Sequence, residues 1–410
     1  MSSESEYYSE TSSSDELQSD DEQNINMELI GDILKNYNII YKLGKGSFST
    51  VWLAFNITDN KFYALKVQNP SEYKAGVEEI NFVKKLPTNP PVFNNIIEHF
   101  VEERNNRRYL CSVWNLHCSN IDSIIRKHNK GGFTLDIANK IMKQLVIAVN
   151  ILHNKFKVFH GDIKTDNILI KGISDRDAFL IKRYTEMEFF NKYSNAKKEF
   201  CLNKIDTIKK QDKLNIRKIV HKEITEQITK EFHESGISNY SIPAKYIEDM
   251  NISLGDFGTH CSEDNHYDEQ FGTRYYMAPE IILLGDCSYP VDIWALGCTY
   301  FELLTGGLLF DPIKDMKHSR DYYHLQLISD TCGELEQSFL KKTERCKEFY
   351  DMKFRLINYQ SPEKSRLLHK LQSCSFDSQK MNDIKIILIN MIRTNPKIRI
   401  SAKGLINFFS

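Results

Sequence analysis

The sequence has few of the features that would place it in a membrane or in an oxidising compartment. No apolar run approaches the roughly 18 residues that a membrane helix requires, and the first residues are acidic and Ser-rich where a signal peptide would be basic and then apolar. The nine cysteines form no C-x-x-C pair and no alternating Cys/His pattern, which argues against a zinc site and a disulfide framework. We therefore expect a soluble chain with reduced thiols, located in the cytoplasm or the nucleus.

The chain also lacks a net charge of either sign. With 54 Lys and Arg against 55 Asp and Glu, the formal charge is -1, so no overall attraction draws it to nucleic acid or to anionic lipid. We expect neither nucleic-acid nor membrane binding, and any charged partner site must be local. Its 410 residues are enough for two or three domains.

Residues 1 to about 29 contain many Ser and acidic residues and almost nothing apolar to bury. Ordering such a segment would not be repaid, so it is expected to be a disordered tail. It could act as a solubilising tail or be phosphorylated on Ser by another enzyme, and composition does not decide between the two.

The pattern of apolar residues then predicts a β-rich part followed by a helical part. Strand-like runs over residues 37–44, 49–55 and 61–67 are separated by Gly or Asp/Asn turns. Apolar residues recur at three and four positions over residues 75–86 and 135–156, which indicates helices. The chain from about residue 290 also reads as mostly helical, so the fold class is α+β.

Residues 171 to about 250 fit this plan badly, because they are Lys/Glu-rich and low in Gly and Pro. We interpret them as an insertion. One amphipathic helix is expected within it, with Ile219, Ile224, Ile228 and Phe232 on the buried face.

A glycine-rich turn between two predicted strands suggests a polyphosphate site. Glycines let backbone N–H groups approach phosphate oxygens, and Lys66 on the following strand would supply a positive charge. Glu79 on the next helix would pair with Lys66. Alone, a Gly-x-Gly is usually a tight turn and a helix Glu is usually a solvated charge. The residues of the turn are Leu43, Gly44, Lys45, Gly46, Ser47, Phe48, Ser49, Thr50 and Val51.

Two further groups carry acid/base and metal chemistry. Asp162 can accept the proton of an attacking hydroxyl and Lys164 can neutralise a transferring phosphoryl group. Asn167 and Asp256, the latter in a Gly-Asp-Phe-Gly run, offer oxygens to Mg²⁺, which prefers few protein ligands plus phosphate oxygens. Each group alone could be a loop with a capping Asp, but their combination in this order is specific.

The order of these motifs resembles the eukaryotic protein kinase domain over residues 37–410. The resemblance implies a bilobal fold, with a small antiparallel β-rich lobe and one main helix at about 37–116 and a larger, mostly helical lobe at about 117–410. Downstream segments agree with the family pattern: 272–280, 292–297 and 396–399. By resemblance, Glu280 should pair with Arg399, and Thr273 should bond near Asp162 and Lys164.

The resemblance also implies ATP and Mg²⁺ as cofactors. Trp114 lies at the family's gatekeeper position, and the backbone of Asn115 to His117 would hold the adenine. Further nucleotide-binding residues are expected on the neighbouring strands and turn: Leu43, Gly44, Lys45, Gly46, Ser47, Phe48, Ser49, Thr50, Val51, Ala64, Lys66 and Leu169.

Among kinases, the chain is most similar to the SR-protein kinases, which phosphorylate Ser in Arg/Ser repeats. The segments KLGKGSFSTVWLAF, EYKAGVEEI, HGDIKTDNILI and SRDYYHLQLISDTCGEL carry this similarity, together with the long insertion before Asp256. An insertion of this size can be regulatory, a docking site or merely a tolerated surface loop.

The sequence departs from the common kinase pattern at a few positions. Ser49 replaces the third Gly of the turn, as in SR-protein kinases. Gly161 replaces the Arg that, in many kinases, binds the activating phosphate carried by another residue. Glu269 occupies the position that is usually phosphorylated. We therefore expect constitutive activity without phosphorylation of the activation segment, which runs from Asp256 to Glu280.

The residues expected to bind the substrate match the SR-protein kinase pattern less well than the catalytic residues do. SR-protein kinases bind basic peptides on an acidic groove; the matching stretch here keeps Asp321 and Asp330 but has Tyr322 and Tyr323 where acids are expected. Residues 277–278 also look like those of a generic kinase. Arg/Ser-rich proteins thus remain plausible substrates with weakened docking.

The sequence argues against three other functions. A pseudokinase acting as a binding or scaffolding module would usually lack one of Lys66, Asp162, Asn167 or Asp256, and all are present. The complete Ala-Pro-Glu segment argues against a small-molecule kinase, and Lys164 argues against tyrosine specificity.

The family default is a monomer. The Ile, Asn and Lys bias is typical of an AT-rich genome, such as that of a protist or a large DNA virus, in which case the protein could also enter the virion.

Overall fold

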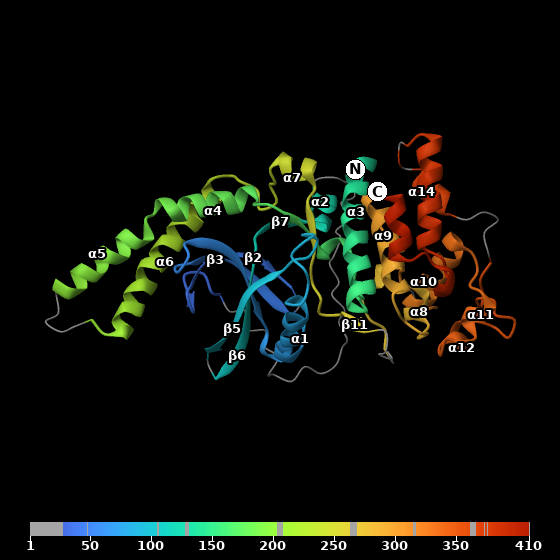
Figure 1. Cartoon of the computed structure of the whole chain (residues 1–410), viewed down its shortest axis with the longest axis horizontal. Helices are drawn as coiled ribbons and strands as arrows, with labels where there is room; N and C mark the ends of the chain where they lie inside the picture. Colours follow the sequence, from blue (N-terminus) through green and yellow to red (C-terminus); the bar gives the residue numbers. More distant parts are fainter. Residues whose placement is uncertain are drawn as a thin grey trace.

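The computed structural model describes residues 28–409 apart from 47, 105, 128–130, 203–207, 263–268, 315–316, 361–365, 373 and 375. Figure 1 shows a twisted β-sheet beside a larger group of helices, with a pair of long helices extending on the far side of the sheet. The predicted α+β fold, with a small antiparallel β-rich lobe and a larger helical lobe, is confirmed.

The small lobe is a six-stranded antiparallel sheet in the order β1-β2-β3-β4-β6-β5. Side chains alternate between its faces, so Trp52 and Ala54 belong to one apolar cluster and Leu53 and Phe55 to another. The three predicted strands are β2, β3 and β4. The strand bounds are β1 Ile33–Leu34, β2 Tyr37–Lys45, β3 Ser49–Asn56, β4 Lys61–Gln68, β5 Ile96–Arg104 and β6 Arg107–Trp114.

Helix α1 (Tyr73–Val83) is the main helix of the small lobe and confirms the helix predicted near residues 75–86. It buries Glu79, Ile80, Phe82 and Val83. Phe82 and Val83 pack in the large-lobe core, and Glu79 lines the cleft between the lobes. This orientation directs a carboxylate toward the strand that carries Lys66.

The large lobe is built around α3 (Leu135–Ile151) and α9 (Pro290–Thr305), which pack against each other. Helix α9 is buried along nearly its whole length, including Trp294, because it lies at the centre of the lobe. The other helices are α2 Ile121–Lys127, α8 Pro279–Ile282, α10 Arg320–Cys332, α11 Gln337–Leu340, α12 Cys346–Phe349, α13 Leu367–Leu371, α14 Ser378–Met391 and α15 Ala402–Leu405.

Short strands at the cleft edge of the large lobe carry the loops of the site. Strands β10 (Ile252–Leu254), β9 (Ile168–Lys171) and β7 (His117–Asn120) form one sheet, and β8 (Val158–Phe159) pairs with β11 (Cys261–Ser262). None of the described helices combines the length with the apolar character that spanning a bilayer requires.

The insertion between β9 and β10 is helical and covers the outer face of the small-lobe sheet (Figure 1). Its helices are α4 Asp175–Glu186, α5 Phe189–Leu202, α6 Lys210–Glu234 and α7 Ala244–Asp249. On α6, Ile224, Ile228 and Phe232 are buried as predicted, but Ile219 is 59% exposed. The prediction for Ile219 was wrong because Ile216 and Val220, one turn apart, form the inward stripe instead.

The chain enters the sheet slightly earlier than the sequence suggested. Leu29, assigned to the disordered tail, is buried beside Leu34 and Tyr37. The rest of the predicted tail, residues 1–27, lies outside the described residues.

Candidate active site

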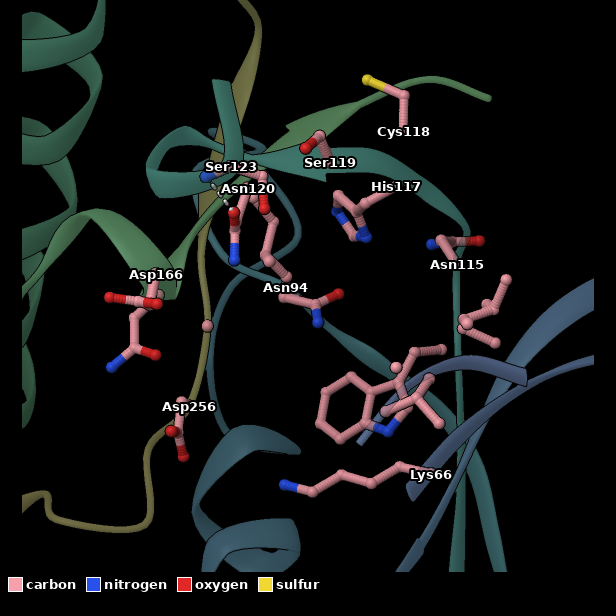
Figure 2. Close-up of a pocket in the computed structure, with 18 of the residues that line it drawn as sticks. Lys66, Asn94, Asn115, His117, Cys118, Ser119, Asn120, Ser123, Asp166 and Asp256 are labelled. Carbon is pink, nitrogen blue, oxygen red and sulfur yellow. Dashed lines mark hydrogen bonds between the residues drawn. The ribbon is translucent and has the colours of Figure 1, made fainter. Parts of the chain in front are cut away.

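A cavity of about 430 Å³ lies between the two lobes. Its walls combine apolar side chains from the small lobe with polar side chains from the large lobe, and Figure 2 shows Lys66 and Asp256 approaching it from facing elements. The predicted site residues among its lining are Leu43, Gly44, Val51, Ala64, Lys66, Glu79, Trp114, Asn115, His117, Asn167, Leu169 and Asp256.

The glycine-rich turn closes the β2–β3 hairpin above this cavity. Gly44 pairs with Val51 across the hairpin, and the N–H of Gly46 donates to the carbonyl of Ser49 at 2.9 Å. A Cβ at Gly44 would meet no atom within 4 Å, so its backbone is open to a ligand. Phe48 is 63% exposed at the tip. Lys45, Gly46, Phe48, Ser49 and Thr50 belong to the hairpin but not to the cavity lining given above; Ser47 lies outside the described residues.

Lys66 and Glu79 form an ion pair between the sheet and α1. Nζ of Lys66 lies 2.9 Å from Oε2 of Glu79, and the Glu79 carboxylate is almost fully buried. Strand β4 lies between β3 and β6, so Lys66 is fixed opposite Val51 on one side and Ser112 on the other. The ammonium group therefore has one defined position at the cavity wall.

Residues 114–117 link the lobes and form one side of the cavity. Trp114 ends β6 and its indole N–H donates to Ser112 Oγ at 2.9 Å, which fixes the ring. His117 Nε2 lies 2.8 Å from Ser253 Oγ, and burial lowers the pKa of His117 to about 4. His117 is consequently neutral at pH 7.

The loop from His160 to Asn167 is held from below by Asp292 at the start of α9. Asp292 is 1% exposed and accepts hydrogen bonds from the backbone N–H groups of His160 and Gly161, at 2.8 and 2.9 Å. Its Oδ2 also lies 2.8 Å from His153 Nε2. Burial alone would raise the pKa of Asp292, but His153 and the other donors outweigh it and the pKa is lowered.

His160 connects this loop to the segment that carries Asp256. Its Nδ1 accepts the N–H of Asp162 at 3.3 Å, which leaves Nε2–H to donate to the carbonyl of Gly255 at 3.1 Å. The N–H of Gly255 in turn donates to the carbonyl of Asn167 at 2.9 Å. The two loops are thereby held at a fixed separation.

Both carboxylate oxygens of Asp162 have partners. Oδ1 accepts the N–H and the hydroxyl of Thr273 at 2.8 and 2.7 Å, and Oδ2 lies 2.9 Å from Nζ of Lys164. Burial would raise the pKa of Asp162, but the charge of Lys164 and these hydrogen bonds outweigh it, so the pKa lies below its ordinary value. Asp162 is thus ionised at neutral pH. The predicted contacts of Thr273 with Asp162 and Lys164 are confirmed.

Asn167 and Asp256 present oxygens on neighbouring loops. The amide nitrogen of Asn167 donates to the carbonyl of Asp162 at 2.8 Å, which turns its oxygen away from that contact. Asp256 is exposed in the cavity and has a φ of 60°. Few non-glycine residues adopt this left-handed conformation, and here it aims the carboxylate at the cavity while Phe257 is buried.

Phe257, and Glu280 at the end of the activation segment, hold the loops of the site in place. Phe257 packs against Phe82 of α1 and against His160, with ring centroids 5.6 and 5.0 Å apart. Farther away, Arg399 donates to both oxygens of Glu280 at 2.6 and 3.0 Å, and both side chains are buried, which confirms the predicted pair.

Gly161 occupies a position where no side chain fits. Its φ is +80°, and a Cβ there would lie 2.9 Å from the carbonyl oxygen of Thr259 and 3.6 Å from the Phe271 ring. The activation segment therefore packs directly on the loop that carries Asp162.

The sequence interpretation missed several residues that line the cavity. Asp166 lies between the predicted residues Lys164 and Asn167, so its position in the sequence was a signal for the site. Burial and nearby Asp122 raise the pKa of Asp166. The insertion contributes Arg176, Asn239 and Tyr240 to the lining, for which the sequence held no signal. Other missed residues are Asn94, Cys118, Ser119, Asn120 and Ser123.

Comparisons with known proteins agree with this geometry. The family model described as "Protein kinase domain" matches residues 37–182 and 244–408, leaving out most of the insertion. The chain is similar to "Serine/threonine-protein kinase SRPK" of Physarum polycephalum, with 26% identity over 91% of this chain and 85% of the relative. It is also similar to "Serine/threonine-protein kinase spk-1" of Caenorhabditis elegans (24%; 80% and 44%) and "Protein kinase dsk1" of Schizosaccharomyces pombe (22%; 91% and 80%).

Proposed function

This chain belongs to the protein kinase domain family and is a serine/threonine protein kinase, and we propose that it transfers the γ-phosphate of Mg-ATP within the cavity between its lobes. The observation that carries the proposal is the convergence of Lys66, Asn167 and Asp256 on one cavity, with Lys66 already paired to Glu79 at 2.9 Å. Asp162 lies just outside the lining and is tied to it through Asn167.

The adenine would lie between the apolar side chains of Val51 and Ala64 from above and Leu169 from below. The backbone of Asn115 to His117 would supply its hydrogen bonds. Lys66 would orient the α- and β-phosphates, since its ammonium is held by Glu79 and is not free to rotate away.

Asn167 and Asp256 fit a magnesium ion, because one amide oxygen and one carboxylate leave most of the coordination sphere to phosphate and water. The open exposure of Asp256 and its constrained backbone support this assignment. A bound Mg²⁺ would neutralise charge on the phosphates. The protein's own residues would position the reacting groups.

Asp162 would align the substrate hydroxyl and accept its proton, while Lys164 would stabilise the charge on the transferring phosphoryl group. The lowered pKa makes Asp162 a weak base, so its main contribution is orientation. Thr273 holds both side chains in register.

Activity should not depend on phosphorylation of the activation segment. The space beside Gly161, where a phosphate-binding Arg would stand in many kinases, is filled by Thr259 and Phe271. The Lys66–Glu79 pair and the Thr273–Asp162 hydrogen bond, at 2.9 and 2.7 Å, are both formed.

Arg/Ser-rich proteins are the proposed substrate class, on the similarity to SR-protein kinases. The two acids of the expected docking groove, however, are engaged within the chain. Asp321 contacts Arg274 and Arg345, and Asp330 accepts the hydroxyl of Tyr359 at 2.8 Å and lies 3.3 Å from Arg366. Substrate arginines would therefore have to bind closer to the active site than the expected docking groove.

The test is ATP-dependent phosphate transfer by purified protein to an Arg/Ser-repeat peptide, beside a generic basic protein, with Asp162→Ala as control. Preference for the repeat supports the full proposal. Transfer to the generic protein alone keeps the kinase and removes the substrate class. ATP binding without any transfer would favour a pseudokinase.

A further inference from the structure

Helices α5 and α6 extend from the small lobe as a hairpin (Figure 1). The outer part of this hairpin is strongly basic. We call residues 189–202 and 209–222 the basic arm. It carries nine basic residues against two acidic ones, Glu199 and Asp212. The second half of α6 has the opposite balance, so the charge is concentrated toward the free end of the hairpin. The basic residues are Lys192, Lys197, Lys198, Lys209, Lys210, Lys213, Arg217, Lys218 and Lys222.

Little of this charge is used inside the described structure. Arg217 donates to Asn38 Oδ1 at 2.6 and 3.1 Å, which anchors α6 to β2. Lys222 lies 3.8 Å from Glu226. Lys198, Lys210, Lys213 and Lys218 are exposed and form no ion pair with the described residues. Clustered charges of one sign repel each other, so a counter-charged partner would stabilise the arm.

The chain's own N-terminal segment has the complementary charge. Residues 1–27 contain eight Asp and Glu and no Lys or Arg. The formal charge of the segment, -8, nearly balances that of the basic arm, which is +7 from nine basic and two acidic residues.

The N-terminal segment joins the folded body beside the basic arm. Glu28 and Asp32 line an open cleft together with Leu214 and Lys218 of α6. Gly31 lies so close to α6 that a Cβ there would be 3.3 Å from the Lys222 side chain. Leu29 is buried and fixes this junction.

The attached segment is long enough to follow the arm. Helix α6 has 25 residues and is therefore about 37 Å long, whereas 27 extended residues can span roughly 90 Å. A segment tethered this close has an effective concentration on the order of millimolar, which favours it over a free polyanion.

We propose that the acidic N-terminal segment, residues 4–22, binds along the basic arm of the same molecule, where its carboxylates neutralise the exposed lysines. This interaction surface is independent of the catalytic assignment. A single-stranded RNA or another polyanion would have to displace the segment to reach the arm.

The experiment uses the full chain with a fluorescence donor on the N-terminal amine and an acceptor on Cys201. Among the cysteines, Cys201 is the exposed one, and it lies near the end of α5. We expect energy transfer that is independent of protein concentration and falls at least about twofold in 1 M salt, where the screening length is roughly 3 Å. Replacing Lys210, Lys213, Lys218 and Lys222 by Gln should produce the same fall at low salt.

The matched control replaces the exposed lysines Lys341, Lys347, Lys353 and Lys403 of the large lobe by Gln, which changes the net charge equally. Energy transfer should then stay unchanged. A complementary variant replaces Asp15, Glu16, Asp20, Asp21 and Glu22 by their amides. Its energy transfer should fall as it does in the arm variant. If both lysine variants behave alike, or transfer rises with protein concentration, the intramolecular contact is excluded.

Binding of a fluorescent single-stranded RNA of about 20 nucleotides gives an independent readout. If the segment covers the arm, the amide variant should bind this RNA about tenfold more tightly than the unaltered chain at low salt. Equal affinities would mean that the arm is uncovered and would overturn the proposal.

Discussion

The hydroxyl of Thr273 donates a hydrogen bond to Oδ1 of Asp162 at 2.7 Å and accepts one from Nζ of Lys164 at 2.7 Å. The activation segment thus completes the catalytic loop through a single side chain. We expect Thr273→Val to lower kcat about 10- to 100-fold with little change in the KM for ATP, because positioning of both catalytic side chains is lost. Thr273→Ser keeps the hydroxyl and should keep most of the activity. Steady-state kinetics with a peptide substrate decide this; equal rates for Val and Ser would contradict it.

The pH dependence of the reaction should report the Lys164–Asp162 contact. Lys164 is the largest of the influences that hold the pKa of Asp162 below its ordinary value against the effect of burial. Removing that charge in Lys164→Met raises the pKa, so Asp162 becomes protonated at a higher pH. The acidic limb of kcat/KM should therefore move upward, and the loss of activity should be larger at pH 5 than at pH 8. A variant profile parallel to that of the unaltered enzyme would refute the assignment of this limb to Asp162.

Glu79 and Glu78 are neighbours on α1 with different surroundings, which makes them a matched pair. Glu79 is buried against Lys66, whereas Glu78 is exposed. Glu79→Gln removes the charge that holds Lys66, and we expect kcat/KM for ATP to fall about 10- to 100-fold. Glu78→Gln should remain within about twofold, as is usual for an exposed side chain. Similar losses in both variants would mean that the pair has no special role.

The buried pair of Glu280 and Arg399 should contribute to stability more than to chemistry. Arg399→Ala leaves the Glu280 carboxylate buried without a partner, which typically costs about 3–5 kcal/mol. Urea unfolding should show this loss, with residual kcat at low temperature changing far less. Arg393→Ala, an exposed position a few residues earlier, should leave the unfolding midpoint almost unchanged.

The packing of the insertion on the sheet can be tested on a single helix. Ile224 is fully buried and Ile219 is 59% exposed, both on α6. Ile224→Ala should destabilise the chain by about 2–5 kcal/mol, because it leaves a cavity against the sheet. Ile219→Ala should cost less than about 0.5 kcal/mol. Comparable unfolding midpoints for the two variants would show that the insertion is not docked on the sheet in solution.

The sequence predicted the local elements and the order of the catalytic residues well, because these depend on short-range signals. The β-branched and aromatic run over 49–55, bounded by turn residues, predicted β3, and the spacing of apolar residues in 135–156 predicted α3. The wrong placement of Ile219 has a different origin. A helix with apolar residues on more than one side is oriented by the surface it meets, and that surface, the outer face of β2 and β3, lies far away in sequence.

Contacts between segments that are distant in the chain could not be predicted from the sequence either. Nothing in the sequence around Arg176 or Tyr240 indicates that the insertion reaches the cavity, because this depends on where α4 and α7 leave the body. Likewise, Asp321 looked available for docking, and only the folded chain brings Arg274 and Arg345 to it.

The chain passes between the lobes at residues 115–117 and does so again at each end of the insertion. Both ends start from one place, since the N–H of Lys171 donates to the carbonyl of Asn251 at 2.9 Å, and the helices between them lie on the small-lobe sheet. A body attached to another at two separated places can turn only about the line that joins them. Opening of the cavity should therefore follow one axis of rotation, and exchange of nucleotide should depend on how far that single rotation can proceed.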